Sequence, residues 1–482
     1  MAAAAAAAAA VASRRPLHGL LRRFWGPSRD FSQMTRRQPS PPPPSSEELI
    51  RLEGEHSAHN YHPIPMVFSR AAGCCVWDPE GNKYIDFLSA YSAVNQGHCH
   101  PKVMEALVDQ AGRITLSSRA FYNDKFPVFA ELLTRMFGFE MVLPMNTGAE
   151  GVETALKLAR KWGYEKKGIP KDKAIIVSCC GCFHGRTLGV ISMSCDNEAV
   201  CGFGPLLPGH MKVDFGDIEG LKKIFEEHGE QIAAFLFEPI QGEAGVIMPS
   251  DGYLRAARDL CSRHYVLMIA DEIQTGLGRT GKLLGCDWEG ISPDVVILGK
   301  ALGAGVLPVS AVLADRDVMM CIKPGEHGST FGGNPLSSAV AIASLKVIED
   351  EGLADRAAEL GVELRGQLEK VKQRFPELIK EVRGRGLLNA VELNGETLSP
   401  VSAFDICLRM KERGILAKPT HGTIIRLAPP LSISLEELSE GPRVLGDVLG
   451  LDLPELRNRK SPESKPPSPQ PCHRCGRRMY SS

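Results

Sequence analysis

Two apolar runs in the middle of the chain each end beside a residue that can do chemistry. Val266–Ala270 is followed by Asp271, and Pro293–Leu298 is followed by Gly299 and Lys300. In open α/β sheets, ligands collect outside the carboxyl ends of the strands, so we expect Asp271 and Lys300 to face one crevice. A purely structural ion pair between the two is the alternative, because such pairs also occur at strand ends.

A carboxylate and a lysine amine in one crevice suit pyridoxal 5′-phosphate. The lysine holds the cofactor's aldehyde as a Schiff base, and the acid keeps the pyridine nitrogen protonated, which makes the ring an electron sink. Once released, Lys300 can move a proton as general base and general acid. Phe183 follows another apolar run and could stack its ring on a flat cofactor. The pattern therefore predicts Lys300 and Asp271 as catalytic residues.

Two further segments could bind the phosphate of such a cofactor. Thr147 and Glu150 have the spacing of a capping box at a helix start, and Gly148 between them allows a close backbone approach. The free N–H groups of a helix start bind phosphate. Ser329 and Thr330 add hydroxyl groups in a glycine-rich loop.

One motif points to a different class of enzyme. Gly276–Gly281 matches the dinucleotide-binding fingerprint, which makes a nicotinamide-dependent dehydrogenase the alternative. However, Asp271–Thr275 separates this motif from the strand before it, and the glycine-broken Lys282–Trp288 is unsuited to the helix that should follow. The context that the fingerprint requires is therefore missing.

The elements that must position these residues alternate between strands and helices, which predicts an α/β fold with a mostly parallel sheet. From about residue 340, long amphipathic helices (Leu345–Phe375) and a few strands indicate a smaller α+β domain. The expected strands are Met141–Pro144, Ala174–Ser178, Ala233–Phe237, Val266–Ala270, Val295–Leu298 and Pro308–Leu313, and helices are expected at Glu150–Trp162 and Gly252–His264. The expected divisions are a leader (1–40), a linker with an N-terminal segment (41–95), a large cofactor-binding domain (96–345), a small C-terminal domain (346–455) and a disordered tail (456–482).

The composition excludes several kinds of partner. Lys+Arg 56 against Asp+Glu 57 gives a formal charge of −1, which argues against nucleic-acid binding and against a polybasic membrane surface. All apolar runs are too short for a transmembrane helix. The 14 cysteines lack the spacing of a disulfide scaffold, so we expect thiols in a reducing compartment.

The two ends of the chain differ from its middle. The leader is rich in arginine and contains a single acid, Asp30, which is typical of a mitochondrial transit peptide and predicts the mitochondrial matrix. A secretory signal is the wrong interpretation because the charges follow the apolar run. A disordered, alanine-rich leader without a targeting function stays an alternative. In the tail, Cys472 and Cys475 resemble half a zinc site, but a second ligand pair is missing and no metal is expected.

Longer motifs resemble a known family. Asp271–Gly281, followed by Lys300, is similar to the class III aminotransferases of pyridoxal-phosphate fold type I. Over roughly residues 55–430 the chain resembles most the branch of this family that acts on ornithine. The segments that carry this resemblance are Ser92–His98, Ser118–Tyr122, Leu143–Gly148, Glu238–Gly245, Lys323–Gly328 and Ala417–Gly422.

The resemblance implies a role for each candidate residue of the cofactor site. Lys300 is then the Schiff-base lysine and Asp271 the partner of the pyridinium nitrogen. Gln274 would bind the phenolic oxygen and Phe183 would stack on the ring. Thr330 would reach the phosphate from a neighbouring subunit, which implies a homodimer with shared active sites or a higher oligomer. The implied cofactor-binding residues are Gly148, Ala149, Phe183, Asp271, Gln274, Lys300, Ser329 and Thr330.

For the substrates, the resemblance implies transfer of the δ-amino group of ornithine to 2-oxoglutarate. Tyr61, Tyr91 and Arg186 would hold the distant α-carboxylate, for which a guanidinium fork is well suited. Arg426 would bind the carboxylate of 2-oxoglutarate beside the reacting carbon, and Glu243 would neutralise Arg426 while ornithine is bound. A plain structural salt bridge is the alternative for this pair. Acetylornithine and 4-aminobutyrate aminotransferases remain alternatives for the reaction, since they would share Lys300.

One departure from the family concerns the C-terminal helix. Ornithine-using members that resemble this chain end in a continuous amphipathic helix, whereas Gly441 and Pro442 predict an interruption after Leu435–Glu440. The tail beyond it is expected to have no counterpart in the family. A folded protein without activity that serves only as a binding partner is therefore a second hypothesis.

Overall fold

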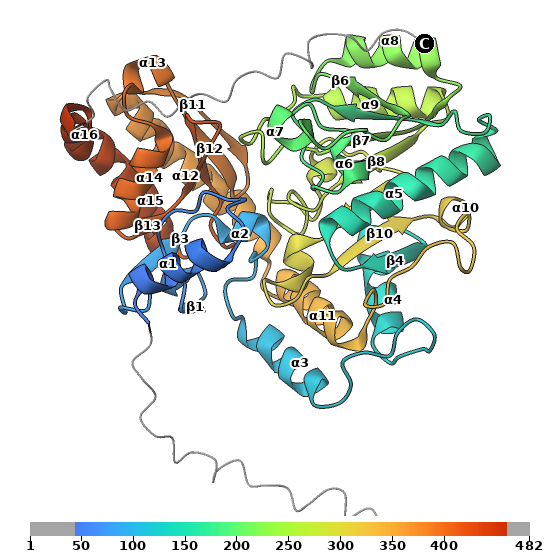
Figure 1. Cartoon of the computed structure of the whole chain (residues 1–482), viewed down its shortest axis with the longest axis horizontal. Coiled ribbons are helices and arrows are strands. Elements are labelled where there is room, and N and C mark those ends of the chain that lie inside the picture. Colours follow the sequence, from blue (N-terminus) through green and yellow to red (C-terminus); the bar gives the residue numbers. More distant parts are fainter. Residues whose placement is uncertain (1–43, 460–482) are drawn as a thin grey trace, which may run out of the picture. The chain divides into compact units, whose positions relative to one another are not determined.

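The computed structural model describes residues 44–459. The predicted leader, most of the Pro-Ser linker and the Cys472 and Cys475 pair lie outside these residues. The chain divides into two units, of which the first ends at Ala58 and contains the helix α1 (Ser46–His56). The second unit, from His59 onward, contains every other described element (Figure 1). No helix among residues 44–459 is long and apolar enough to cross a membrane.

A seven-stranded sheet forms the centre of the second unit. Its strands lie in the order β4-β10-β9-β8-β7-β5-β6, and all are parallel except β10, which is antiparallel to both neighbours. The six predicted strands are confirmed to within two residues. The sheet consists of β4 (Met141–Met145), β5 (Ile175–Cys179), β6 (His210–Val213), β7 (Ile232–Phe237), β8 (Leu267–Asp271), β9 (Val295–Leu298) and β10 (Ser310–Ala314).

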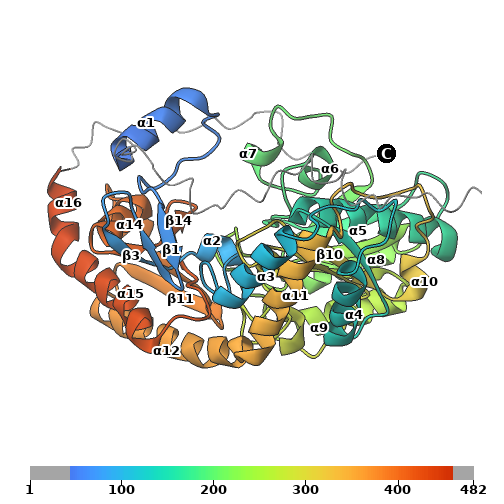
Figure 2. The same ribbon diagram turned by 90° about the horizontal axis from the view of Figure 1, so that it is seen from below.

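Helices cover both faces of this sheet, as a parallel sheet requires. Alternate residues of each strand enter different cores: Ile269 and Ile297 lie with α5 (Gly148–Trp162), whereas Met268 and Val296 lie with α8 (Ile218–His228) and α9 (Tyr253–Arg263). Figure 2 shows α5 and α9 on opposite sides of the sheet. The predicted helices at Glu150–Trp162 and Gly252–His264 are thereby confirmed.

Two smaller sheets accompany the central one. The N-terminal strands join a strand from far along the chain, because β3 pairs in parallel with β13. The first small sheet has the order β1-β2-β3-β13 and the second has the order β11-β12-β15-β14. Their strands are β1 (Arg70–Ala72), β2 (Cys75–Trp77), β3 (Lys83–Asp86) and β13 (Ile415–Leu416), then β11 (Ile379–Arg385), β12 (Leu388–Leu393), β14 (Lys418–Thr420) and β15 (Ile424–Leu427).

The long helical region predicted at Leu345–Phe375 is divided at Gly352, whose φ of 59° lies in the left-handed region that favours glycine. The helices on either side are α11 (Pro335–Asp350) and α12 (Leu353–Arg374). The remaining helices are α2 (Ser89–Ser92), α3 (Pro101–Ala111), α4 (Phe126–Phe137), α6 (Leu188–Ile191), α7 (Asn197–Val200), α10 (Arg316–Met319), α13 (Gly395–Leu398), α14 (Ala403–Glu412), α15 (Leu435–Asp447) and α16 (Leu453–Arg459).

The interruption predicted at Gly441 and Pro442 is wrong. Helix α15 runs through both residues, and a π-helical turn then joins it to α16. A proline inside a helix costs about 3 kcal/mol, but here tertiary packing offsets that cost. Both residues are buried, and a Cβ atom at Gly441 would lie 2.5 Å from the ring of Phe87, so only glycine permits this close packing.

Candidate active site

The carboxyl ends of four neighbouring strands carry the candidate catalytic residues. Asp271 ends β8, Lys300 follows β9, and β8 lies between β9 and β7 in the sheet. His184 and Glu238 follow β5 and β7, which are the next two strands. The prediction that Asp271 and Lys300 share one edge of the sheet is therefore confirmed.

Asp271 is paired with histidine rather than with lysine. One carboxylate oxygen, Oδ2, lies 2.7 Å from Nδ1 of His184, and the other accepts a hydrogen bond of 3.1 Å from the backbone N–H of Ile273. Asp271 and His184 are each 4% exposed. The structural ion pair between Asp271 and Lys300 is therefore the wrong interpretation, because within residues 44–459 Asp271 forms its ion pair with His184.

The Lys300 amine lies in a charged but desolvated environment. Burial lowers the pKa of Lys300, and the carboxylates of Asp271 and Glu243 oppose this only in part. A lowered pKa makes the neutral amine, which is the nucleophile and the base, more available near neutral pH. Lys300 also has a φ of 40°, which is uncommon for a residue other than glycine and is typical of functional sites.

Glu238 was missed by the sequence analysis although it belongs to a quoted motif. It is 4% exposed, and burial raises its pKa to about 7. Its two oxygens accept hydrogen bonds from the backbone N–H groups of Phe183 (2.8 Å) and Gly242 (3.1 Å). Glu238 thus joins the loop of the predicted stacking residue Phe183 to the loop of Glu243. The available signal was its position directly after the apolar run Ala233–Phe237, in the same kind of place as Asp271.

The predicted phosphate end forms where α5 begins. Thr147 accepts a hydrogen bond from the N–H of Glu150, whose carboxylate binds the N–H of Thr147, so the predicted capping box is confirmed. The N–H groups of Gly148 and Ala149 come before the first intrahelical hydrogen bonds and point out of the helix start. A cavity of about 380 Å³ is lined by residues 146–148 and by Lys300.

The glycine-rich loop reaches the same place. The hydroxyl of Ser329 accepts a hydrogen bond of 2.8 Å from the side chain of Asn146, which adjoins the start of α5. Thr330 is exposed. Gly276–Gly281, the match to the dinucleotide-binding fingerprint, forms turns. The segment after it contains a short 3-10 turn (Gly285–Trp288), whereas the fingerprint requires a long helix there.

These residues fit pyridoxal phosphate by the chemistry of their donors and acceptors. The start of α5 offers N–H groups and a favourable dipole to a phosphate. Asp271, fixed by His184, offers a carboxylate to a pyridinium nitrogen, and Lys300 offers an amine to an aldehyde. Gly148 and Lys300 line the same cavity, so the proposed phosphate-binding residues and the amine lie around one space.

Glu243 and Arg426 form the predicted ion pair. Oε1 of Glu243 lies 2.8 Å from the guanidinium of Arg426, which is 3% exposed. Burial alone would raise the pKa of Glu243, but Arg426 and Lys300 hold it below its ordinary value, and Gln274 hydrogen-bonds the same carboxyl. A Cβ atom at Gly242 would lie 2.3 Å from the amide oxygen of Gln274, so glycine is needed for this approach.

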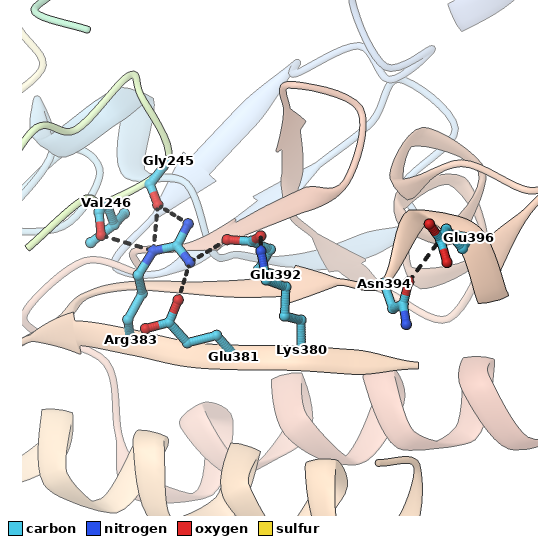
Figure 3. A network of polar contacts seen from close by, with 8 residues as sticks. All are labelled: Gly245, Val246, Lys380, Glu381, Arg383, Glu392, Asn394 and Glu396. Atoms are coloured by element: carbon cyan, nitrogen blue, oxygen red, sulfur yellow. Dashed lines mark hydrogen bonds and ion pairs between the residues drawn. The ribbon is translucent and has the colours of Figure 1, made fainter. Parts of the chain in front are cut away.

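Arg383 on β11 fixes the loop that follows Glu243. Its guanidinium donates to the carbonyl oxygens of Gly245 (2.8 Å) and Val246 (3.1 Å), and to the carboxylate of Glu392 (2.6 Å; Figure 3). Arg383 therefore holds the loop of Glu243 against the sheet that contains Arg426 on β15. The sequence analysis did not identify this residue.

Tyr91 lies against Arg426 and is presented by an unusual turn. The guanidinium of Arg426 lies 4.7 Å from the centre of the Tyr91 ring. Helix α2 is a single left-handed turn, in which Ser89, Ala90, Tyr91 and Ser92 have φ values between 46° and 72°. For residues with a Cβ atom, this conformation costs about 1–2 kcal/mol per residue, so neighbouring contacts must hold it.

The other predicted substrate residues lie further out. Tyr61 is 73% exposed, and its ring centre lies 5.8 Å from the ammonium of Lys418, which is also 5.5 Å from the Tyr91 ring. The side chain of Arg186 is 55% exposed, lies over the Phe183 ring at 5.0 Å and approaches Asp196 at 3.8 Å. The structure thus brings Tyr91, Glu243 and Arg426 together, whereas Tyr61 and Arg186 face solvent. The sequence analysis did not identify Lys418.

A disulfide closes the segment that contains Arg186. Cys180, just after β5, pairs with Cys195, and their Cα atoms are 5.4 Å apart. The expectation of thiols throughout is therefore wrong for this pair. The physical reason is that the loop after β5 returns to its own start within 15 residues, at a Cα separation that suits a disulfide. Nine other cysteines of residues 44–459 are free thiols, among them Cys179 and Cys182 in the same region.

Comparisons with known proteins identify a family over most of the chain. The model of the family described as Aminotransferase class-III matches residues 56–449. The protein named Ornithine aminotransferase, mitochondrial, from Oryza sativa subsp. japonica is 74% identical over 436 residues, which cover 90% of this chain and 92% of that protein. The crystal structure of the ornithine aminotransferase from Toxoplasma gondii ME49 has a TM-score of 0.82 at 43% identity, covering 92% of this chain and all of that one.

A second plant relative corrects the expectation about the tail. Ornithine aminotransferase, mitochondrial, from Arabidopsis thaliana is 67% identical over 472 residues, which cover 98% of this chain and 99% of that protein. So high a coverage leaves too few residues unmatched for the whole tail (456–482) to lack a counterpart. At least part of the tail therefore has a counterpart in this relative.

Proposed function

The chain belongs to the class III aminotransferases, and we propose that it transfers the δ-amino group of L-ornithine to 2-oxoglutarate, giving glutamate 5-semialdehyde and glutamate. The observation that carries the proposal is the ion pair of Glu243 and Arg426 close to Lys300. It neutralises Arg426, whose charge acts on the Lys300 amine, and this favours a substrate amine without a carboxylate beside it. The names of both plant relatives favour ornithine among such amines.

The cofactor is pyridoxal 5′-phosphate, which supplies the electron sink for the carbanion formed at the substrate carbon. Gly148, Ala149, Ser329 and a partner subunit's copy of Thr330 would hold its phosphate. Phe183 would stack on the ring, and Asp271 would keep the ring nitrogen protonated. His184 orients Asp271 through the hydrogen bond of 2.7 Å between them.

The protein's own residues would then perform two tasks. Lys300, whose pKa is lowered by burial, would move the proton at the reacting carbon as base and as acid. Arg186, Tyr61 and Tyr91 would hold the α-carboxylate of ornithine away from Lys300. In the second half-reaction Glu243 would release Arg426, whose guanidinium would then bind the carboxylate of 2-oxoglutarate.

A substrate panel tests the proposal. Purified protein loaded with cofactor is given ornithine, N-acetylornithine or 4-aminobutyrate together with 2-oxoglutarate, and the glutamate formed is measured. We expect the highest kcat/KM with ornithine. A higher kcat/KM with either of the other two amines would assign the chain to that activity instead. A folded protein that binds cofactor and turns over no amine would support the alternative of an inactive binding partner.

We further propose that residues 1–40 direct the protein to the mitochondrial matrix and that it works as a homodimer. The Arg-rich leader and the word mitochondrial in the names of the plant relatives support the first point. Import of a fluorescent fusion of residues 1–45 tests it, and a diffuse cytosolic signal would contradict it. Mass photometry of the purified protein tests the dimer.

A further inference from the structure

Arg279 is the largest side chain that is completely buried among residues 44–459, with an exposed fraction of 0%. It belongs to the segment Gly276–Gly281, for which the fold offers no dinucleotide role. Its pKa is lowered to about 9 by burial, so the guanidinium remains charged at neutral pH. A buried charge is costly unless hydrogen bonds satisfy it, so its partners must account for its presence.

All five N–H donors of the guanidinium have acceptors. Nε and one N–H of Nη2 bind Oδ1 of Asn95 at 3.2 and 2.6 Å, and Nη2 also donates to Oγ of Ser89 at 2.9 Å. Nη1 donates to the carbonyl oxygens of Leu387 (2.9 Å) and Pro429 (2.6 Å). None of the four partners is an acid, so the planar fork joins neutral groups from three separate chain segments.

Two of these three segments place Tyr91 and Arg426. Ser89 begins the left-handed turn α2 that ends with Ser92, and Asn95 follows that turn. Pro429 follows the strand β15 that contains Arg426. The hydroxyl of Ser89 also donates to the carbonyl of Ala428 at 2.7 Å, so the start of the turn is tied directly to the end of that strand.

We propose that Arg279 is a positioning residue for substrate selection, which holds the strained turn Ser89–Ser92 so that Tyr91 stays against Arg426. This inference rests on the proposed role of Tyr91 and Arg426 in substrate binding. Arg279 touches neither substrate nor cofactor in this arrangement. It acts through Ser89, and the four consecutive positive φ values explain why the turn needs such a support.

The test compares two variants with a matched control. Arg279→Lys keeps the charge but replaces the planar fork by a point donor that cannot reach all four acceptors. Ser89→Ala keeps Arg279 and removes the hydroxyl that joins the turn to Arg279 and to the carbonyl of Ala428, so it stays informative if Arg279→Lys does not fold. The control is Lys167→Met, because Lys167 is a half-buried cation that donates to three backbone carbonyls, of Gly229, Ile232 and His264.

Two measurements are made on the full-length protein loaded with cofactor. Hydrogen–deuterium exchange of a peptide spanning residues 87–96 should be at least about tenfold faster in Arg279→Lys, and faster in Ser89→Ala, but unchanged in Lys167→Met. The KM for 2-oxoglutarate should rise about tenfold in Arg279→Lys while kcat falls less than about threefold. Adding Tyr91→Ala to Arg279→Lys should raise this KM no further.

Unchanged exchange at residues 87–96 in both Arg279→Lys and Ser89→Ala would overturn the proposal, as would equal KM effects of Arg279→Lys and Lys167→Met. Failure of the proposed function has a different signature. The wild type would then not turn over ornithine, while the exchange experiment would still decide whether Arg279 holds the turn.

Discussion

The two halves of the candidate site differ in how firmly the protein fixes them. At the cofactor half, Asp271, His184 and Glu238 are each 4% exposed and hydrogen-bonded to one another's loops. At the outer substrate half, Tyr61 is 73% exposed and the Arg186 side chain is 55% exposed. The difference leads us to expect that the proposed chemistry depends on side chains fixed at the edge of the sheet, whereas the proposed recognition of the distant carboxylate depends on exposed side chains. Changes in the first half should therefore lower kcat, and changes in the second should raise KM.

The largest effect is expected from Lys300→Ala. Loss of the amine removes both the attachment point of the cofactor and the base, so kcat should fall at least about 10³-fold. The visible absorption band of the bound cofactor should shift or disappear. Absorption spectra and single-turnover assays measure both effects, and a variant that keeps a large fraction of its turnover would remove Lys300 from the mechanism.

Asp271→Asn should lower kcat about 10²- to 10³-fold, because an amide cannot stabilise a positive charge on the ring nitrogen. The matched control is Asp294→Asn. It removes a carboxylate outside the proposed site that accepts a hydrogen bond of 2.7 Å from Arg258. The control should lower the melting temperature and leave kcat almost unchanged. Equal losses of kcat in both variants would show that Asp271 matters only for folding.

Arg186→Lys should act on the outer half alone. A lysine cannot bind both carboxylate oxygens through a fork, so the KM for ornithine should rise about 10- to 100-fold with a much smaller change in kcat. Arg255→Lys on α9 is the control. Steady-state kinetics with varied ornithine measures this, and an unchanged KM would place the carboxylate elsewhere, with Lys418 beside Tyr61 as the next candidate.

The cofactor half of the site, which contains Asp271 and Lys300 and is called the inner half below, could be predicted from the sequence to a greater extent than the outer substrate half. Strand ends, a capping box and glycine spacing are local features, so Asp271, Lys300 and the start of α5 could be placed from these features of the sequence. The roles of His184, Arg279 and Arg383 could not be predicted, because they depend on which loops meet in space. In the sequence, a buried arginine cannot be distinguished from any other charged loop residue. The same reason explains the error at Gly441 and Pro442, where the close packing of Gly441 against Phe87, which is distant in sequence, could not be foreseen from local helix propensity.

Glu243→Ala tests whether the Glu243–Arg426 ion pair controls which amine of ornithine reacts. Without the carboxylate, Arg426 stays available, so part of the ornithine should react through its α-amine, next to the carboxylate that Arg426 attracts. NMR analysis of the products distinguishes the two amines. Glu243→Gln keeps the shape of the side chain and removes its charge. It should therefore behave like Glu243→Ala if the charge of Glu243 controls which amine reacts. Products derived entirely from the δ-amine in both variants would reduce the pair to a structural salt bridge.

The smallest effect is expected from Glu238→Gln, and it concerns the pH dependence of stability in the inner half. Burial raises the pKa of Glu238 to about 7 in the folded protein, whereas the side chain titrates near about 4.3 when unfolded. Between these values the folded state holds a proton that the unfolded state has released, so the free energy of unfolding falls as pH rises through this window. The loss is fully present above about pH 7 and is on the order of 3–4 kcal/mol.

Glutamine cannot ionise, so this part of the pH dependence should vanish in the variant. The melting temperature of Glu238→Gln relative to wild type should therefore rise between pH 5 and pH 8 in a series of thermal unfolding experiments at about one-unit steps. Glu359→Gln, at an exposed position of α12, should show a constant difference. A constant difference for Glu238→Gln as well would mean that the acid stays ionised throughout. The inner half would then contain a permanent charge beside Asp271, and its rigidity would come from the two N–H bonds to Glu238 at every pH.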